Sequence, residues 1–373
     1  MFGGIPVKEV GALKPYWDAF PGLKYELFEQ VNDATMRIKV QDIGKTIASN
    51  AEVVSYRGLF KERFSDFEQY LYDELIDEID LVNRASEEDE ITKEVFNRLS
   101  GLPLIDCYDA FQDLDDIWQE ISIDLEILQT EGFDATKKVD PNMVVKKKQG
   151  KDVEVQDGWV GRVLPFSLVQ NAFLTEEVSS LEQNEERLSA ITAEITEIFE
   201  GLSDEDKDAA GDAVGEDSFV SSKISAALKQ LKDEDPSSAS DEESILFRLT
   251  RVAALFNEEK VLKKTIKDVR IGLEKKTKEM IESLTDEQVC TLLDEKWIKP
   301  LVHRFEKLPD RVVNQLNDLV KALGEKYLTT YSDIDSQIQE AEASLAAMLG
   351  ELTGNEFDLA GLNELRSLLG GEL

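Results

Sequence analysis

Apolar residues recur every three or four positions over much of this chain, and this spacing constrains its fold more than any other feature. Such steps place side chains on one face of an α-helix, and a seven-residue repeat keeps that face against a partner helix. The clearest series are Leu174, Val178, Leu181, Leu188, Ile191, Ile195 and Ile198; Leu262, Ile266, Val269 and Leu273; and Ile334, Ile338, Ala341, Leu345, Met348 and Leu352. They predict a mainly α fold with long, coiled-coil-like helical arms.

The arms are expected to be antiparallel, because consecutive helices joined by loops in one chain pack most simply that way. Each apolar seam can be closed within the chain or by a helix of another subunit, and periodicity does not decide between the two. The C-terminal seam is a candidate partner contact through Ile334, Ile338, Leu345, Met348 and Leu352.

Residues 1–130 are rich in aromatic side chains and are predicted to form a helical domain. Two stretches have helical spacing, and aromatic stripes of this kind are usually core. The first contains Phe60, Phe64, Phe67, Leu71, Leu75 and Ile79, and the second contains Phe111, Leu114, Ile117, Trp118, Ile121 and Leu125.

Residues 131–170 are predicted to be a linker with a small β-hairpin insertion. Several Gly and Pro residues interrupt any long helix there, and Val153 and Val155 alternate with polar neighbours after a turn at Gln149 and Gly150. The remaining residues, 171–373, are predicted to be the long-helix region. Two acidic segments within it, near 202–217 and 233–243, are expected to be flexible loops.

The chain has 78 acidic and 42 basic residues and a formal charge of −36. Because nucleic-acid affinity depends mainly on cations that neutralise phosphates, so acidic a surface repels nucleic acid in general. One interpretation is a solvated acidic surface. The alternatives are a surface matched to a basic partner and an acidic mimic of DNA.

Two islands of positive charge interrupt the acidic background. Residues 136–151 hold six lysines and one aspartate, and residues 260–278 hold eight basic residues and two acids. These cations can pair with acids of the same chain, or they can contact DNA phosphates or a partner. The candidates for such a contact are Lys137, Lys138, Lys146, Lys147, Lys148, Lys151, Lys260, Lys264, Lys267 and Arg270.

No catalytic, cofactor-binding or metal-binding motif is recognisable in the sequence. His303 is the single histidine, and it is expected to cap or pack at a helix turn near Pro300 and Pro309. Cys107 and Cys290 lie far apart and outside any CxxC spacing, so we expect two reduced, buried cysteines. The absence of a signal peptide and of a long apolar run favours a cytoplasmic protein without a membrane span.

Several long phrases resemble the methylation subunit of type I restriction-modification systems, in its part downstream of the catalytic domain. They are GGIPVKEVGALKPYWDAFPGLKYELF at 3–28, GLPLIDCYDAFQDLDDIWQEI at 101–121, the glycine-rich passage at 131–174 that contains GWVGRVLPFSLVQ, and the segments at 283–302, 326–335 and 351–365. Together they extend over nearly the whole chain.

The resemblance implies adenine-N6 methylation of DNA with S-adenosylmethionine, in a complex of methylation, specificity and restriction subunits. The motif for that chemistry, Asn or Asp-Pro-Pro-aromatic, is missing, since Asp140-Pro141-Asn142-Met143 lacks both the second proline and the aromatic residue. We therefore expect a chain that is inactive alone and binds no cofactor. It would dock to the specificity subunit and support a catalytic part outside this chain. An unrelated helical scaffold is the remaining alternative.

Overall fold

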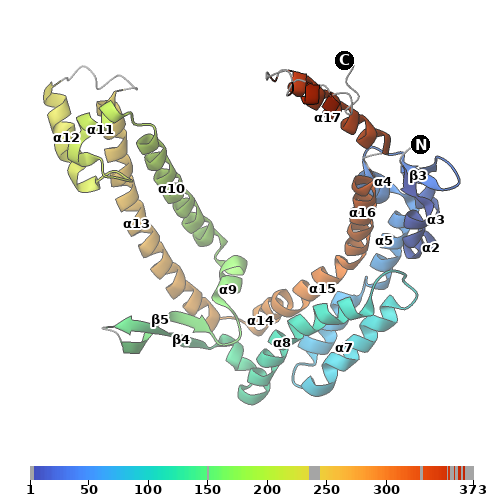
Figure 1. Cartoon of the computed structure of the whole chain (residues 1–373). Coiled ribbons are helices and arrows are strands. Elements are labelled where there is room, and N and C mark those ends of the chain that lie inside the picture. Colours follow the sequence, from blue (N-terminus) through green and yellow to red (C-terminus); the bar gives the residue numbers. More distant parts are fainter. Residues whose placement is uncertain are drawn as a thin grey trace. The chain divides into compact units, whose positions relative to one another are not determined.

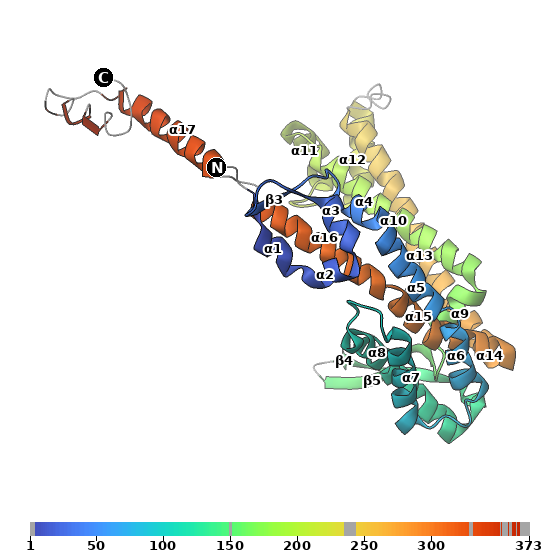
Figure 2. The ribbon, with the colours of Figure 1, turned by 90° about the vertical axis from the view of Figure 1, so that its right-hand side faces the viewer.

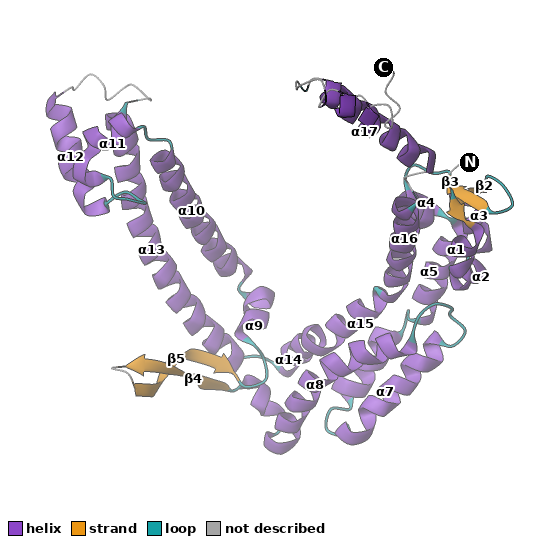
Figure 3. Cartoon of the chain, viewed as in Figure 1, coloured by secondary structure: helices purple, strands orange, loops and turns teal. Residues whose placement is uncertain are grey.

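The computed structural model describes residues 4–148, 151–234, 244–327 and 331–350, together with 352, 357, 360–362, 364 and 365. The fold is mainly α, and the strands in these residues form two small antiparallel sheets (Figure 3), which confirms the predicted fold class. The chain divides into two compact units. Unit 1 comprises Met1–Glu120 and Ile298–Leu373, and unit 2 comprises Ile121–Trp297. These units cut across the expected ranges 1–130, 131–170 and 171–373.

Unit 1 begins with a three-stranded antiparallel sheet in the order β1-β3-β2, which the sequence pattern did not indicate. Its strands are β1 (Ile5–Pro6), β2 (Phe28–Gln30) and β3 (Thr35–Ile38), and three short helices lie between β1 and β2: α1 (Val7–Ala12), α2 (Lys14–Ala19) and α3 (Pro21–Leu27). The Asn32 side chain accepts hydrogen bonds from the backbone N–H groups of Ala34 and Thr35, which stabilises the β2–β3 turn.

The rest of unit 1 is helical. Its elements are α4 (Ile43–Ser49), α5 (Ala51–Arg63), α6 (Phe67–Tyr72), the π-helical turn η1 (Asp73–Asp77), α7 (Arg84–Leu99), the first part of α8 (Cys107–Glu131), α15 (Lys299–Glu306), α16 (Leu308–Lys326) and α17 (Tyr331–Gly350). The side chains of Asp42, Asn50 and Asn83 cap α4, α5 and α7. Helix α16 lies beside α4 and α5 (Figure 2), so the C-terminal residues complete the core of the N-terminal unit.

Both aromatic stripes predicted as core are largely buried. In the first, Phe60, Phe67 and Leu71 are buried, and the Phe67 ring lies 5.5 Å from that of Phe305 on α15. In the second, which continues into unit 2, the buried side chains are Leu114, Ile117, Trp118, Ile121 and Leu125. The spacing of apolar residues therefore identified the core-facing side of these helices correctly.

Unit 2 contains the predicted hairpin and the long helices. Its elements after α8 are the 3-10 turn η2 (Phe133–Lys137), β4 (Val139–Lys148), β5 (Lys151–Gly161), α9 (Phe166–Phe173), α10 (Thr175–Glu200), α11 (Asp204–Ala210), the 3-10 turn η3 (Gly211–Ala213), α12 (Ser221–Glu234), α13 (Ile245–Glu282), α14 (Asp286–Leu293) and the π-helical turn η5 (Asp294–Ile298), which ends in unit 1. The hairpin pairs Val139 with Gly161 and Lys148 with Lys151. Its expected turn, Gln149 and Gly150, lies outside the described residues.

Helices α10 and α13 run side by side (Figure 1) and close two of the three predicted seams within the chain. Ile191 on α10 and Ile266 and Leu273 on α13 are buried, as is Leu174 just before α10. The remaining members of both seams are half-buried. Only one face of each helix is covered in a two-helix pair, so this intermediate burial is the expected outcome.

The acidic segment 202–217 differs from the mobile loop that we expected. It contains α11 and η3, and the Ser203 hydroxyl and Asp206 carboxylate form a capping box at the start of α11. Ala210 and Ala213 are buried with Phe219, Ile224, Leu249 and Val252 in a small core between α10, α12 and α13. The few apolar residues of the segment are thus sufficient to order it. Of the second predicted loop, residues 235–243 lie outside the described residues.

Candidate interaction surfaces

The hairpin of unit 2 is attached to α13 at its base. Glu274 of α13 accepts a hydrogen bond of 2.8 Å from the backbone N–H of Trp159, and the Lys278 ammonium lies 3.3 Å from the centre of the Trp159 ring. Gly158 has φ +80°, and a Cβ atom there would collide with the Glu274 carboxylate. The glycine before the tryptophan in the phrase GWVG therefore has a structural reason, which is the positive φ that other residues rarely adopt; a larger residue would also displace the Glu274 carboxylate.

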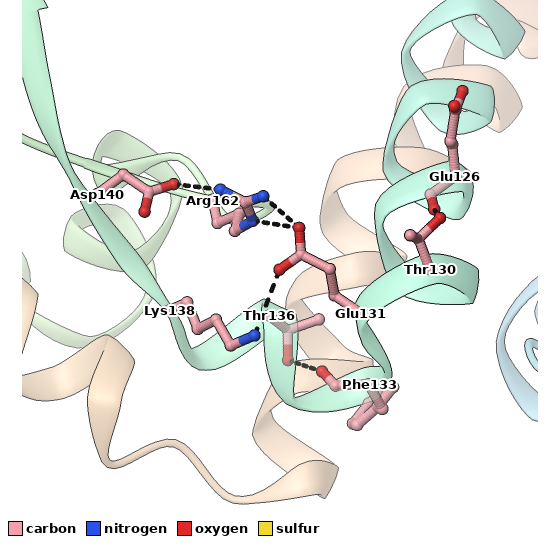
Figure 4. A network of polar contacts seen from close by, with 8 residues as sticks. All are labelled: Glu126, Thr130, Glu131, Phe133, Thr136, Lys138, Asp140 and Arg162. Atoms are coloured by element: carbon pink, nitrogen blue, oxygen red, sulfur yellow. Dashed lines mark hydrogen bonds and ion pairs between the residues drawn. The ribbon is translucent and has the colours of Figure 1, made fainter.

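A polar network joins the end of α8 to the same hairpin (Figure 4). Arg162 pairs with Glu131 and, at 2.8 Å, with Asp140, and the Lys138 ammonium lies 3.3 Å from the second oxygen of Glu131. Arg162 and then Lys138 hold the pKa of the Glu131 carboxyl below its usual range. Within this network, Lys138 serves the fold of unit 2.

The other hairpin candidates have different surroundings. Lys137 pairs with Asp286 at 2.5 Å, and Lys146 pairs with Asp157 on the opposite strand at 3.0 Å. Lys147 is exposed, and no ion pair to it is found among the described residues. The side chains of Lys148 and Lys151 lie outside the described part. Intramolecular ion pairing thus applies to Lys137, Lys138 and Lys146, three of the predicted contact residues.

Ion pairs align the long helices of unit 2 in antiparallel register. They are Arg251–Glu194, Arg187–Glu258, Arg270–Glu185 and Lys276–Glu177, with N–O distances between 2.5 and 2.7 Å. Residue numbers fall on α10 as they rise on α13, as an antiparallel pair requires. Arg270, one of the predicted partner contacts, is therefore engaged with α10.

Lys260, Lys264 and Lys267, the remaining candidates on α13, are exposed. Among the residues that the structure describes, no acidic group lies within ion-pair distance of these three ammonium groups. These three lysines are therefore the predicted contact residues of α13 that remain accessible to DNA phosphates or a partner.

The C-terminal seam is exposed on α17. Leu345 is 46% exposed, Met348 is 62% exposed and Ile338 is similarly accessible, while the side chain of Ile334 lies outside the described residues. Leu352, the last member of the predicted seam, is also exposed but lies beyond the end of α17 at Gly350. The three predicted seams thus divide into two that close within the chain and one that presents apolar side chains to solvent.

Few other groups suggest chemistry. His303 is on the surface, 4.0 Å from Glu306, and the described residues contain no group of His, Cys, Asp and Glu suited to a metal ion. Our expectation that both cysteines are buried is wrong for Cys107, which is exposed. No helix in the described ranges is apolar over a length that could cross a bilayer.

Unit 1 contains a pocket of about 400 Å³ among α5, α6, α15 and α16. Phe60, Phe64 and Phe305 line it, and Arg57 at its rim pairs with Asp310 at 2.7 Å. An apolar group fits such a lining. The pocket has no nucleophile and base in hydrogen-bonding geometry, so it does not resemble an active site.

Sequence reasoning missed a buried polar cluster in unit 2. Lys296 and the Trp297 indole N–H both bind the Asp124 carboxylate. The sequence did contain an indication of this cluster, because Asp124 follows Ile121 by three positions and so falls on the apolar face of α8. An acid at such a position predicts a buried partner.

No family model, curated protein or solved structure matches this chain. The surfaces described above and the sequence phrases therefore carry the functional argument.

Proposed function

We propose that this chain is the downstream, non-catalytic part of a type I methylation subunit and that it docks to the specificity subunit of that system. The sequence phrases, which extend over nearly the whole chain, support the family. The exposed apolar seam of α17 is the single structural observation that carries the docking role.

The α17 seam has the chemistry of an unfilled helix–helix contact. Ile338, Leu345 and Met348 are separated by seven and three residues and lie on one face of α17 over a length of about 15 Å, and the exposed Leu352 follows the end of the helix at Gly350. Exposed apolar surface of this extent is unfavourable in water and is typical of a protein-binding site. A helix of the specificity subunit, carrying its own apolar seam, is the proposed occupant.

In this proposal the chemistry belongs to a catalytic part outside this chain. That part binds S-adenosylmethionine and methylates adenine. This chain attaches the catalytic part to the specificity subunit, which selects the DNA site. The restriction subunit and DNA join the same cytoplasmic complex. The chain alone is expected to give no heat of S-adenosylmethionine binding in calorimetry, and a micromolar signal would contradict this assignment.

Co-purification tests the docking surface. The full chain is co-expressed with a tagged specificity subunit, and the Leu345→Asp/Met348→Asp variant is expected to lose most of the retained chain. Ala343→Asp/Ala347→Asp places the same two charges on the opposite face of α17, at exposed positions, and should be retained like the wild type. Equal retention of both variants, or no retention of the wild type, would refute the proposal.

The charge of −36 favours one second candidate, an acidic mimic that occupies a DNA-binding surface. A mimic would displace DNA from an assembled restriction complex in a competition experiment. The docking proposal predicts no displacement.

A further inference from the structure

One face of α13, outside its buried contact with α10, carries a row of cations. We call it the α13 basic face, and it consists of Lys260, Lys264, Lys267, Ile271, Lys275 and Lys278. We propose that this face binds the phosphate backbone of a double-stranded nucleic acid without reading its sequence. The inference concerns a different helix and a different chemistry from the proposed docking function and does not depend on it.

The geometry of the face follows from the spacing of its residues. Steps of four, three, four, four and three place all six side chains within an arc of about 80° at 100° per residue. The centre of this arc is roughly 140° from Ile266, which is buried against α10. At 1.5 Å per residue, the row from Lys260 to Lys278 is about 27 Å long. It is a straight array comparable in length with one turn of duplex DNA.

Among the described residues, no ion pair engages the lysines of the N-terminal half of this face, which are Lys260, Lys264 and Lys267. Other cations on α13 pair with α10, as Arg270 does with Glu185 and Lys276 with Glu177. By contrast, no acidic partner of Lys260, Lys264 or Lys267 is found in the described residues, although the chain has 78 acids. Three neighbouring like charges on one helix repel one another. A polyanion placed along them relieves that repulsion.

The charges of the C-terminal half of the face, those of Lys275 and Lys278, are partly neutralised. Glu279 lies 3.7 Å from Lys275, and Glu282 lies 3.9 Å from Lys278, whose ammonium also lies over the Trp159 ring. Long ion pairs of this kind on the surface are weak and exchange readily for phosphate. We therefore assign most of the binding to Lys260, Lys264 and Lys267.

The composition of the face favours a duplex backbone over other anionic partners. Ile271 is its one apolar residue, whereas the buried centre of a protein interface is apolar and poor in lysine. Sequence-tolerant binding of single strands uses exposed aromatic rings as stacking platforms. The ring of Trp159 beside this face is only half-exposed and is occupied by Lys278. Flexible ammonium groups without aromatic or amide neighbours contact phosphates and carry no base readout.

Fluorescence anisotropy with the full chain and a labelled random-sequence duplex of about 30 base pairs tests this proposal. The expected dissociation constant lies in the range of about 10⁻⁴ to 10⁻⁶ M for sequence-independent binding, and binding weakens as NaCl is raised. The triple variant Lys260→Gln/Lys264→Gln/Lys267→Gln should bind at least about tenfold more weakly. Its plot of log affinity against log salt should lose about 2.7 in slope, since each phosphate contact contributes about 0.9.

A control variant separates this face from overall charge. Lys263→Gln/Arg270→Gln/Lys276→Gln removes the same three charges from α13 at positions paired with Glu259, Glu185 and Glu177. It should keep the affinity and the salt slope, with circular dichroism confirming that both variants are folded. The proposal is overturned if the wild type does not bind the duplex, if both variants weaken equally, or if poly-glutamate binds the wild type and the duplex does not.

Discussion

Lys296 and Asp124 form an ion pair inside unit 2, with the lysine Nζ 2.5 Å from the carboxylate Oδ2 and both side chains less than a tenth exposed. The carbonyl of Val163 also accepts from Lys296 at 2.8 Å, and the buried Trp297 indole donates to the same carboxylate oxygen at 2.9 Å. Charges removed from water require such partners. This cluster therefore joins α8, the segment after the hairpin and the turn η5 through polar contacts.

Removing one partner of this ion pair should be costly. Asp124→Asn keeps an acceptor for Trp297 but leaves the Lys296 ammonium uncompensated, so we expect a loss of about 3 kcal/mol or more in unfolding free energy. Chemical denaturation followed by tryptophan fluorescence measures it. The double variant Asp124→Asn/Lys296→Met should lose less than the two single variants summed. Additive losses would show that the two groups do not interact.

The small core around α11 and α12 predicts that residues 202–217 are ordered by packing. Leu249→Ala creates a cavity where Leu249 is fully buried, and it should cost about 2–5 kcal/mol and expose α11 to protease. Phe247→Ala, at a 37% exposed position two residues earlier, is the matched control. If protease cleaves α11 equally fast in all three proteins, the segment is a loop and this description is wrong.

Glu87 on α7 predicts a pH-dependent stability. Burial, and then the neighbouring carboxylates Glu74, Glu90 and Glu78, raise its pKa. The folded chain therefore binds this proton more tightly than the unfolded chain, and the resulting stability is lost as the pH rises through the raised pKa. Glu87→Gln cannot ionise and should melt at a higher temperature than the wild type at pH 7. The difference in melting temperature between the variant and the wild type should narrow towards pH 5. A difference that does not depend on pH would contradict a raised pKa of Glu87.

Much of the helical architecture could be predicted because it depends on local spacing. The series through Ile191 and through Ile266 predicted the long helices α10 and α13 and an antiparallel arrangement of such arms, since a seam at heptad spacing needs a facing helix. That these two helices face each other was not predicted. The hairpin at 139–161 was likewise indicated by alternation and glycine. These features require only the residues of one or two neighbouring segments.

Features that depend on distant partners were not predictable. The N-terminal sheet has strands of two to four residues, and its pairing of Ile5 with Met36 leaves no periodic signal. The return of α16 to the N-terminal unit is equally invisible in the sequence pattern. For the basic islands, spacing placed the lysines on surfaces, but only the packing of α10 showed that Arg270 is paired, whereas no partner of Lys264 is found in the described part of the chain.

Hydrogen exchange of the full chain with and without the specificity subunit tests the central claim most directly, because it locates the docking surface on the chain. We predict slower amide exchange over residues 336–350 of α17 when the specificity subunit is present, and no such change with the Leu345→Asp/Met348→Asp variant. Unchanged exchange in α17 alongside protection elsewhere in the chain, or no protection anywhere, would contradict the account.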